Sequence, residues 1–303
     1  MKQLPLQVSV VIPTRNEEGS IAKVIHDCDT ALRDVSHEVI IVDASQDDTS
    51  SEARKAGAKV VTQRGKGGVG EALTQGFRLA NGEYVVFLDG DGTYNPEDLH
   101  RLIEPLVKGE ADLVNGNRFA GMEDGAMPLT NRIGNRILTW VGNKVFDTKV
   151  KDSQSGMKGF RRNLLTRMTL WERGFPICSE LLAEASKLNL QIVEVGISYR
   201  RRIGESKLKP ASEGPRILWA SLMMLRDYNP LLLFGGLGLA AMTIGLLVVL
   251  PVIYEFLAYR TFRLTGRALI ALLCWLAGLL CIFSGVILDT VNYSIRRLEY
   301  RMT

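Results

Sequence analysis

Short apolar runs alternate with segments of helical period through the first half of the chain. Polar loops separate the two kinds of segment, and this order is typical of a mostly parallel sheet covered by helices. We therefore expect an α/β domain. Its predicted strands are residues 8–12, 38–42, 59–62, 84–88 and 112–115, and its predicted helices are residues 21–32, 49–56, 69–80 and 97–107, the last capped by Asn95 with Pro96 at its first position.

The C-terminal part follows a different pattern, because residues 230–253 and 268–288 contain no charged side chain. Each run exceeds the roughly 20 residues that a helix needs to cross a bilayer. Two buried core helices are the alternative, but globular helices seldom stay apolar on every face over that length. The pattern predicts a hairpin of two membrane spans.

The predicted orientation follows from what surrounds the spans. Residues 1–7 are polar, contain Pro5 and do not resemble a signal peptide. We therefore expect residues 1–210 to form a cytoplasmic domain and the hairpin, residues 230–303, to return the C-terminus to the cytoplasm. Positive charges before and after the hairpin outnumber those of its connecting loop, which favours this orientation. They are Arg200, Arg201, Arg202, Lys207, Lys209, Arg216 and Arg226 before it and Arg296, Arg297 and Arg301 after it, against Arg260, Arg263 and Arg267 in the loop.

Residues 211–229 connect the two parts. The apolar run 217–225 has Trp219 near its start and is followed by Arg226 and Asp227, which predicts an amphipathic helix in the membrane interface. An ordinary helix packed on the first domain explains the pattern nearly as well.

Charge and cysteine content narrow the range of functions. The net charge of +4 is concentrated before the first span, which indicates attraction to anionic lipid or phosphate and argues against a nucleic-acid partner. The four cysteines have no paired or metal-like spacing. We therefore expect reduced, structural thiols.

Two aspartates follow the fourth predicted strand in the sequence Asp89-Gly90-Asp91. Ligands bind beyond the carboxyl ends of strands in open α/β sheets, so both carboxylates are expected to face a site. Carboxylate oxygens hold Mg²⁺ or Mn²⁺ while leaving positions open for substrate phosphates. A polar turn that uses Asp and Gly for their conformations is the alternative.

Polar or glycine-rich loops also follow the first three predicted strands. They are Pro13-Thr14-Arg15-Asn16-Glu17, the segment that begins at Asp43, and Gly65-Lys66-Gly67-Gly68. Such loops meet at one edge of the sheet, as a nucleotide site requires, and glycines let the backbone approach a phosphate. A flexible turn is an equally good explanation of the glycine-rich loop alone.

Motif-like segments follow one another along the first 207 residues of the chain. They are residues 10–17, Asp43, Asp89-Gly90-Asp91, Asn117-Arg118-Phe119, residues 131–135, Asp152-Ser153-Gln154-Ser155-Gly156 with residues 158–161, Ser179-Glu180, and Arg202-Ile203-Gly204-Glu205-Ser206-Lys207. In this order they resemble the motifs of the family 2 glycosyltransferases with the GT-A fold, and within that family those of the polyprenyl-phosphate hexose synthases, of which dolichol-phosphate mannose synthase is the best-known type. The resemblance runs from residue 8 to about residue 207, and the hairpin resembles the subgroup with two C-terminal spans.

The resemblance implies a role for each segment. A guanidinium can grip a phosphate with two hydrogen bonds, which suits the arginines assigned to the lipid phosphate. The implied catalytic residues are Asp89, Asp91, Asp152 and Arg202. The implied nucleotide-sugar site is Pro13, Thr14, Arg15, Asn16, Glu17, Asp43, Lys66, Gly67, Asp89, Gly90, Arg202 and Lys207, the lipid-phosphate site is Arg118, Arg132, Asn135 and Ser155, and the metal ligands are Asp89, Asp91 and Thr93.

Two departures from the family pattern leave specific points open. Ala44 stands where the family often has a second Asp, which leaves the nucleotide base open, and Thr93 stands where it often has Gln, which leaves the third metal ligand open. Whether Asp152 orients the sugar or acts as a base is also open.

The implied reaction is transfer of a hexose, with inversion, from a nucleotide sugar to polyprenyl or dolichyl phosphate with Mg²⁺ or Mn²⁺. GDP-mannose is favoured by the resemblance, and UDP-glucose and UDP-N-acetylglucosamine are alternatives. A non-catalytic membrane scaffold that presents lipid-linked sugars is the alternative from another class. The chain lacks the motifs expected of a sugar-phosphate nucleotidyltransferase and of a polysaccharide synthase. Oligomers are possible through glycines of the first span, Gly235, Gly236 and Gly238.

Overall fold

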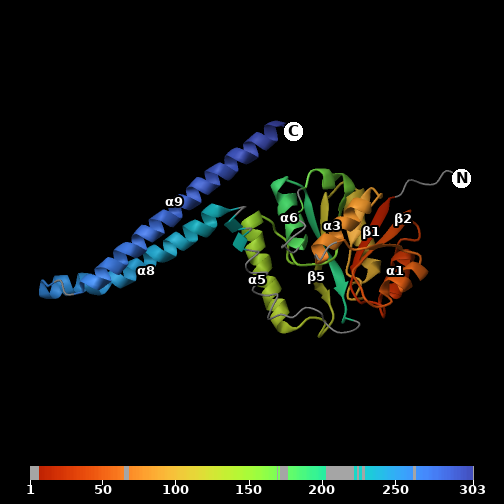
Figure 1. The fold of residues 1–303 in the computed structure, drawn as a ribbon, viewed down its shortest axis with the longest axis horizontal. Helices are drawn as coiled ribbons and strands as arrows, with labels where there is room; N and C mark the ends of the chain where they lie inside the picture. The colour runs from red at the N-terminus through yellow and green to blue at the C-terminus, as the bar shows by residue number, and fades with distance from the viewer. Residues whose placement is uncertain are drawn as a thin grey trace. The chain divides into compact units, whose positions relative to one another are not determined.

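The computed structural model describes residues 7–64, 68–168, 170, 177–202, 222–223, 225–226, 229–261 and 264–302. It divides into two units, residues 1–218 and residues 219–303, which we call the sheet unit and the hairpin unit (Figure 1). Lys66, Gly67 and Lys207 lie outside the described residues, as does most of the interfacial helix predicted for residues 211–229.

The sheet unit contains seven strands in the order β3-β2-β1-β4-β6-β5-β7. Only β6 runs antiparallel to its neighbours, so the predicted mostly parallel sheet is confirmed. The strands β6 and β7 were not predicted, and β5 continues well beyond its predicted end. The strands are β1 (Val8–Thr14), β2 (His37–Asp43), β3 (Lys59–Thr62), β4 (Tyr84–Phe87), β5 (Leu113–Met122), β6 (Lys158–Arg161) and β7 (Ile192–Tyr199).

Helices cover both faces of this sheet (Figure 1). The four predicted helices are present, and the last of them begins as a 3₁₀ turn whose cap, Asn95, accepts a hydrogen bond from the Glu97 N–H at 3.4 Å. The helices α5 and α6 were not predicted. The elements are α1 (Ile21–Ala31), α2 (Thr49–Lys55), α3 (Val69–Leu79), η1 (Pro96–Asp98), α4 (Leu99–Val107), α5 (Leu129–Phe146), η2 (Arg162–Thr166) and α6 (Ile177–Lys187).

Side chains of the strands alternate between two apolar clusters, one on each face. In β1, Val10 and Ile12 pack with α1 and α4, whereas Val11 packs with α3 and α6. Because both faces are buried, the central strands read as continuous apolar runs in the sequence.

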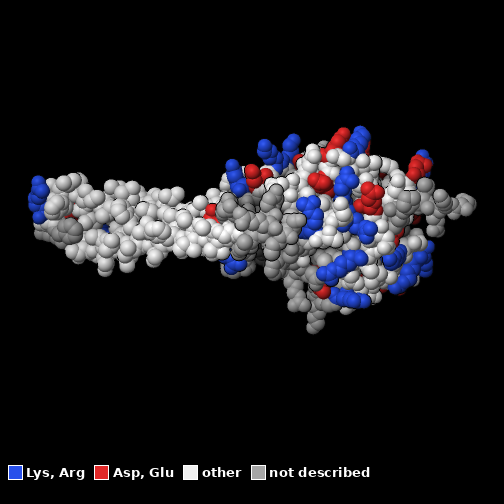
Figure 2. Space-filling model, turned by 90° about the horizontal axis from the view of Figure 1, so that it is seen from above, with Lys and Arg blue, Asp and Glu red and all other residues white. Residues whose placement is uncertain are grey.

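The hairpin unit consists of α8 (Pro230–Tyr259) and α9 (Thr265–Met302), and both are long and apolar enough to cross a membrane. Most of their large apolar side chains are exposed, and the face of the hairpin seen in Figure 2 is white over most of its length, with basic side chains in blue at one end. This inside-out pattern is expected where lipid replaces water. The predicted two-helix hairpin is confirmed.

Small residues bring the two hairpin helices together. A Cβ added at Gly238 would lie 2.6 Å from the Gly278 carbonyl oxygen, so only glycine allows this approach. The indole N–H of Trp275 donates to the Met242 carbonyl at 3.1 Å. Gly238 therefore packs inside the hairpin. Gly236, another of the glycines predicted for contacts between subunits, has no neighbouring atom within 4 Å of an added Cβ.

Candidate active site

The loops that follow β1 and β2 are tied together by hydrogen bonds. The Asn16 N–H donates to the Ser45 hydroxyl at 2.7 Å, and the Asn16 amide oxygen accepts from the Gln46 N–H at 2.9 Å. The Glu17 N–H donates to the Thr49 hydroxyl at 2.8 Å. Asn16 has a φ of 52°, in the left-handed region that Asn tolerates better than most residues.

The predicted donor residues thus share one edge of the sheet. Pro13 and Thr14 close β1, and Arg15 is exposed beyond them. Asp43 closes β2 and is buried.

Hydroxyl groups of the protein surround the Asp43 carboxylate. It accepts hydrogen bonds from Thr14 at 2.7 Å, from Ser50 at 2.6 Å and from the hydroxyl of Ser45. Asp43 therefore organises both loops, and its contact with a nucleotide base stays a prediction. No motif had pointed to Ser45 or Ser50, because their role depends on the crossing of the two loops.

The acidic pair follows β4 at the same edge. A Cβ added at Gly90 would lie 2.9 Å from the Thr14 methyl group, so glycine lets this loop close against β1. The hydroxyl and the N–H of Thr93 donate to one oxygen of Asp91, at 2.6 and 3.0 Å. Burial raises the pKa of Asp89 well above its usual range, and the nearby Asp91 carboxylate raises it further.

Two carboxylates that repel each other fit a divalent cation. Asp89 and Asp91 supply hard oxygen ligands, and Mg²⁺ is commonly held by one or two carboxylates together with substrate phosphates. Within the described ranges, no group of three or more His, Cys, Asp or Glu side chains could hold a metal without such help. Thr93 orients Asp91, and its role as a ligand stays a prediction.

Arg202 lies at this acidic pair although it comes from the far end of the domain sequence. Its guanidinium is 3.3 Å from an Asp91 oxygen and donates to Glu17 at 2.8 Å. Its Nε is buried without a hydrogen-bond partner in the part of the chain that the structure describes. This cation can therefore turn toward an anionic ligand that enters the site.

A second charged pair, Arg118 and Asp152, is buried beside the acidic pair Asp89 and Asp91. The Nε and Nη2 atoms of Arg118 donate to the two oxygens of Asp152 at 2.7 and 2.8 Å. The guanidinium also lies 5.4 Å from the centre of the Tyr199 ring. Both side chains are almost entirely buried, so the pair is held in one geometry.

Tyr94 and Gly156 join the two charged pairs. The Gly156 N–H donates to the Tyr94 hydroxyl at 2.7 Å, and a Cβ added at Gly156 would lie 2.7 Å from an Asp89 oxygen. The segment that carries Asp152 therefore packs directly against the acidic pair. The role of Tyr94 could not be predicted from the sequence, because it depends on the fold that brings residue 156 next to residue 94.

The helix α5 carries two residues predicted for the lipid phosphate. Arg132 donates through Nη2 to the Met122 sulfur at 3.2 Å, and its buried Nε has no hydrogen-bond partner among the described residues. Asn135 donates to the Met127 sulfur at 3.4 Å. Ser155 is completely buried and bonds the Met157 backbone, so its hydroxyl supports its own turn.

Other residues of α5 form an outward apolar stripe. Leu129, Ile133, Ile137 and Trp140 are each more than half exposed, and their spacing of four, four and three places them on one face of the helix. We call these four residues the α5 stripe. Exposed apolar faces of this kind mark binding surfaces.

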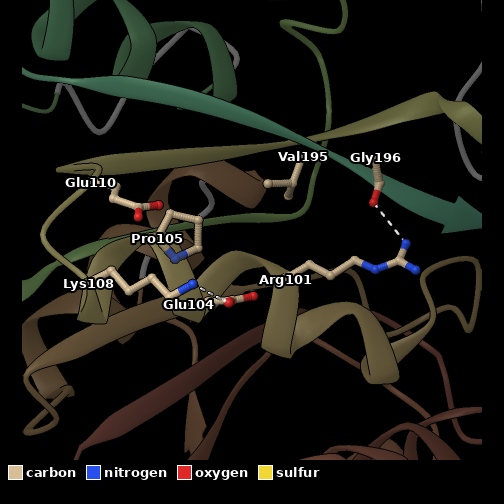
Figure 3. A pocket seen from close by; sticks show the side chains of 7 residues that line it. All are labelled: Arg101, Glu104, Pro105, Lys108, Glu110, Val195 and Gly196. Carbon is tan, nitrogen blue, oxygen red and sulfur yellow. Dashed lines mark hydrogen bonds and ion pairs between the residues drawn. The ribbon is translucent and has the colours of Figure 1, made fainter.

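A surface hollow lies elsewhere on the sheet unit, between α4 and β7 (Figure 3). It measures about 530 Å³ and is lined by charged side chains. Arg101 donates to the Gly196 carbonyl at 3.1 Å, and Lys108 donates to Glu104 at 2.6 Å. These charges pair with the protein itself, and none of the predicted site residues lines the hollow.

Comparison with known families decides between the possible assignments of this site. The model of the family "Glycosyl transferase family 2" matches residues 9–168, which include both charged pairs. The chain belongs to glycosyl transferase family 2. The predicted membership of this family and the prediction of an enzyme are confirmed.

Three curated relatives of this family 2 glycosyltransferase illustrate the similarity. Glycosyltransferase AglJ of Haloferax volcanii is 34% identical over 95% of this chain and 94% of its own length. A dolichyl-phosphate hexose transferase of the same organism is 36% identical over 69% of this chain and 90% of its length. The dolichol-phosphate mannosyltransferase of Pyrococcus furiosus is 30% identical over 67% of this chain and 60% of its length.

Solved structures confirm the GT-A fold of this family 2 glycosyltransferase. Glucosyl-3-phosphoglycerate synthase of Mycobacterium tuberculosis, in complex with phosphoglyceric acid, has a TM-score of 0.59 and 27% identity over 73% of this chain and 79% of that chain. Another structure of that synthase, with a TM-score of 0.58, contains Mn²⁺ and UDP-glucose, and a third contains Mg²⁺ and UDP.

Proposed function

We propose that this family 2 glycosyltransferase transfers a hexose from a nucleotide sugar to a polyprenyl phosphate at the membrane surface. The relatives named for dolichyl-phosphate hexose transfer and dolichol-phosphate mannose transfer support this acceptor class. The two apolar helices of the hairpin unit support anchoring in a bilayer.

The observation that carries the proposal is the dual character of α5. One side of the helix carries Arg132, whose buried Nε is unpartnered among the described residues, and another side carries the α5 stripe. An amphipathic helix with Trp and aliphatic residues outward lies in the membrane interface. A helix in that position would hold Arg132 at the depth of a lipid phosphate.

On the donor side, the acidic residues would hold the metal and the diphosphate. Asp89 and Asp91 would hold Mg²⁺ or Mn²⁺, and Thr93 orients Asp91. The metal would neutralise charge on the leaving diphosphate as a Lewis acid. Arg202 would leave Asp91 and Glu17 and add its charge to the diphosphate as the donor enters.

On the acceptor side, the phosphate would be its own nucleophile. A phosphate monoester with a second pKa near ~6 is largely dianionic at neutral pH, so a general base is unnecessary. This favours Asp152 as the residue that holds Arg118, to which both of its oxygens are bonded. Arg118 and Arg132 would hold the phosphate for a single displacement that inverts the anomeric centre.

For the donor we propose GDP-mannose, with UDP-glucose and UDP-N-acetylglucosamine as alternatives. The mannosyltransferase relative supports the first, and the neighbour that holds UDP-glucose supports the second. We further propose that the sheet unit and both termini face the cytoplasm, as the positive charges around the spans favour.

The test is a transfer assay with the full-length protein in vesicles. Polyprenyl phosphate and Mn²⁺ or Mg²⁺ are supplied with one radiolabelled donor at a time: GDP-mannose, UDP-glucose or UDP-N-acetylglucosamine. We expect one donor to give a labelled lipid that dissolves in organic solvent. The absence of labelled lipid with all three donors would overturn the proposal.

A further inference from the structure

A row of polar side chains crosses the sheet beneath the segment that carries Asp152. Lys158 of β6 is paired in register with Asn115 of β5, which is paired in turn with Glu194 of β7. The Lys158 ammonium donates to the Asn115 amide oxygen, and the Asn115 amide nitrogen donates to a Glu194 oxygen at 2.9 Å. A cation, an amide and a carboxylate thus form a continuous hydrogen-bonded row.

The neighbouring row of the same strands is apolar. Phe160, Leu113 and Ile192 are paired in register two residues further along, and all three belong to the core beneath α3 and α6. Burying a lysine and its amide partner costs free energy that an apolar row avoids. Lys158 and Asn115 are completely buried, so this row needs a reason to be polar.

The reason lies in the segment of residues 150–153, which is held almost entirely by side chains of other elements. Glu194 accepts from the N–H groups of Lys151 and Asp152 at 2.8 and 3.1 Å. Asn115 donates to the Asp152 carbonyl at 3.0 Å, and Lys158 donates to the Ser153 carbonyl at 3.3 Å. The row therefore binds successive peptide groups on both sides of the Asp152 side chain.

The helix α5 holds the same segment from its other side. Asn143 donates to the Val150 carbonyl at 2.7 Å, and the Thr139 hydroxyl accepts from the Ser153 N–H at 3.0 Å. The five side chains that hold residues 150–153 are referred to below as the cradle; they are Asn115, Thr139, Asn143, Lys158 and Glu194.

We propose that the cradle positions the Asp152–Arg118 pair for the acceptor phosphate, with Glu194 and Lys158 as positioning residues that touch no substrate. Asp152 fixes Arg118 through three hydrogen bonds, two from the guanidinium and one from the Arg118 N–H at 3.1 Å. Because the cradle fixes the backbone of Asp152, it also fixes the direction in which the Arg118 guanidinium points.

The charges of the cradle support this role. Lys158 and Arg118 lie near the carboxyl groups of Asp152 and Glu194, so each buried cation has an acidic side chain close to it. Burial lowers the pKa of Lys158 to about 8, whereas Asp152, Glu194 and the thiol of Cys178 favour its charged form and Arg118 opposes it.

This positioning role rests on the proposed function, and the conservative change Glu194→Gln tests it first. The glutamine keeps the shape but has only one acceptor oxygen, so its NH2 group meets either the Asn117 amide, which donates to Oε2 of Glu194 at 3.3 Å, or the three donors of the cradle and residues 151–152. It also removes the negative charge that lies near Lys158. We expect kcat/KM for polyprenyl phosphate to fall by about 10- to 100-fold, since a displacement of about 1 Å can cost that much. The Kd of the nucleotide with Mn²⁺ should stay unchanged.

The matched control is Glu38→Gln. One oxygen of Glu38 accepts from Ser9 at 2.7 Å and from the Asn81 N–H at 2.8 Å, near the start of β2 and away from the site. This variant should stay within about twofold of the wild-type kcat/KM, since a partly buried hydrogen-bond centre away from the site affects stability alone.

Hydrogen exchange separates positioning from general loss of structure. In Glu194→Gln, the amides of residues 151–153 should exchange faster while those of β1 and β4 stay protected. Thr139→Val, which removes one cradle hydrogen bond on α5, should show a smaller change of the same kind and covers the case in which Glu194→Gln does not fold.

Two results would overturn the inference. One is transfer within twofold of wild type in Glu194→Gln and Thr139→Val. The other is an equal loss of nucleotide binding and transfer. If the wild-type protein makes no lipid product, the proposed function is wrong. The positioning role of the cradle is then tested by hydrogen exchange alone, and unchanged exchange of the amides of residues 151–153 in both variants would overturn it.

Discussion

The donor side and the acceptor side of the site are built in different ways. The donor side consists mainly of loops that directly follow β1, β2 and β4, so most of its residues are placed by the strand before them, and hydrogen bonds then tie the first two loops together. Arg202, which follows β7, is the exception. The acceptor side depends on contacts between distant segments, such as Asp152 with Arg118 and Glu194 with Lys151. The donor side is therefore built mostly from strand ends, and the acceptor side from contacts between segments far apart in the sequence.

This difference predicts different responses to mutation. A change to a single donor-side residue such as Asp91 should remove one function and leave the geometry of the acceptor side intact. A change on the acceptor side should spread through the cradle to Arg118. Networks of buried hydrogen bonds are worth more than the sum of single deletions, because each member holds the others.

The largest expected effect comes from Asp91→Asn on the donor side. Turnover should fall by about 1000-fold, because an amide cannot replace the charge that holds the metal and the diphosphate. Steady-state transfer measures this loss, and the thermal midpoint should be unchanged. Asp112→Asn is the matched control, since Asp112 accepts from the Gln191 N–H at 2.9 Å away from the site. Turnover within tenfold of wild type in Asp91→Asn would remove the metal role.

Lys158→Met tests the electrostatics of the cradle through stability. The pKa of Lys158 is lowered from 10.5 to about 8 in the folded protein, so below about pH 8 the wild type carries the full penalty of a buried charge. As pH rises from about 8 to about 10.5, the folded protein releases this proton first, and wild-type stability should gain roughly 3 kcal/mol relative to the variant.

Thermal midpoints of the two detergent-solubilised proteins measure this difference across that pH range. Taking the difference removes the contribution of other groups that titrate there, such as Tyr94 and Tyr199, whose pKa values burial raises. A pH-independent difference would show that Lys158 is not buried as a charged group.

Arg132→Lys should raise the KM for polyprenyl phosphate about tenfold. A guanidinium makes two parallel bonds to a phosphate where an ammonium makes one, and a charge-assisted bond contributes about 1.5 kcal/mol. Arg136→Lys, one turn further along α5 on its exposed side, is the control and should leave KM unchanged. Equal increases in KM for both variants would point to general attraction of anions by α5.

The smallest effect is expected from Ile137→Glu in the α5 stripe. Transfer to a long-chain acceptor in vesicles should fall about threefold to tenfold, because a carboxylate opposes contact with the interface. A short-chain acceptor dispersed in water should restore the wild-type rate. Val107→Glu changes an exposed apolar residue on α4 in the same way and should have no effect. Loss of activity with the short-chain acceptor would contradict a membrane contact.

The same contrast explains how much could be predicted from the sequence. Asp89, Asp91 and Asp43 were identified because each stands at the end of an apolar strand, where local pattern and function coincide. The four helices and five strands of the first half were identified for the same reason. The spans were identified because lipid requires long uncharged helices.

The acceptor side could be predicted only in part. Arg118 and Asp152 were named as separate motif residues, but their pairing depends on β5 lying beside β6, and β6 was not predicted. The cradle left one trace, a polar Asn115 at the end of a predicted strand. Lys158 was named only as part of the motif segment of residues 158–161, and Glu194 gave no signal, because only the register of three strands places them together.

A comparison of acceptors tests most directly whether the acceptor is a lipid phosphate. The wild-type protein in vesicles, with its active donor and Mn²⁺, is given polyprenyl phosphate, the matching polyprenol without phosphate, or phosphoglyceric acid. We expect labelled sugar on polyprenyl phosphate alone, because in the proposed function Arg118 and Arg132 bind the phosphate and α5 binds the membrane. Transfer to the polyprenol or to phosphoglyceric acid, with none to polyprenyl phosphate, would contradict it.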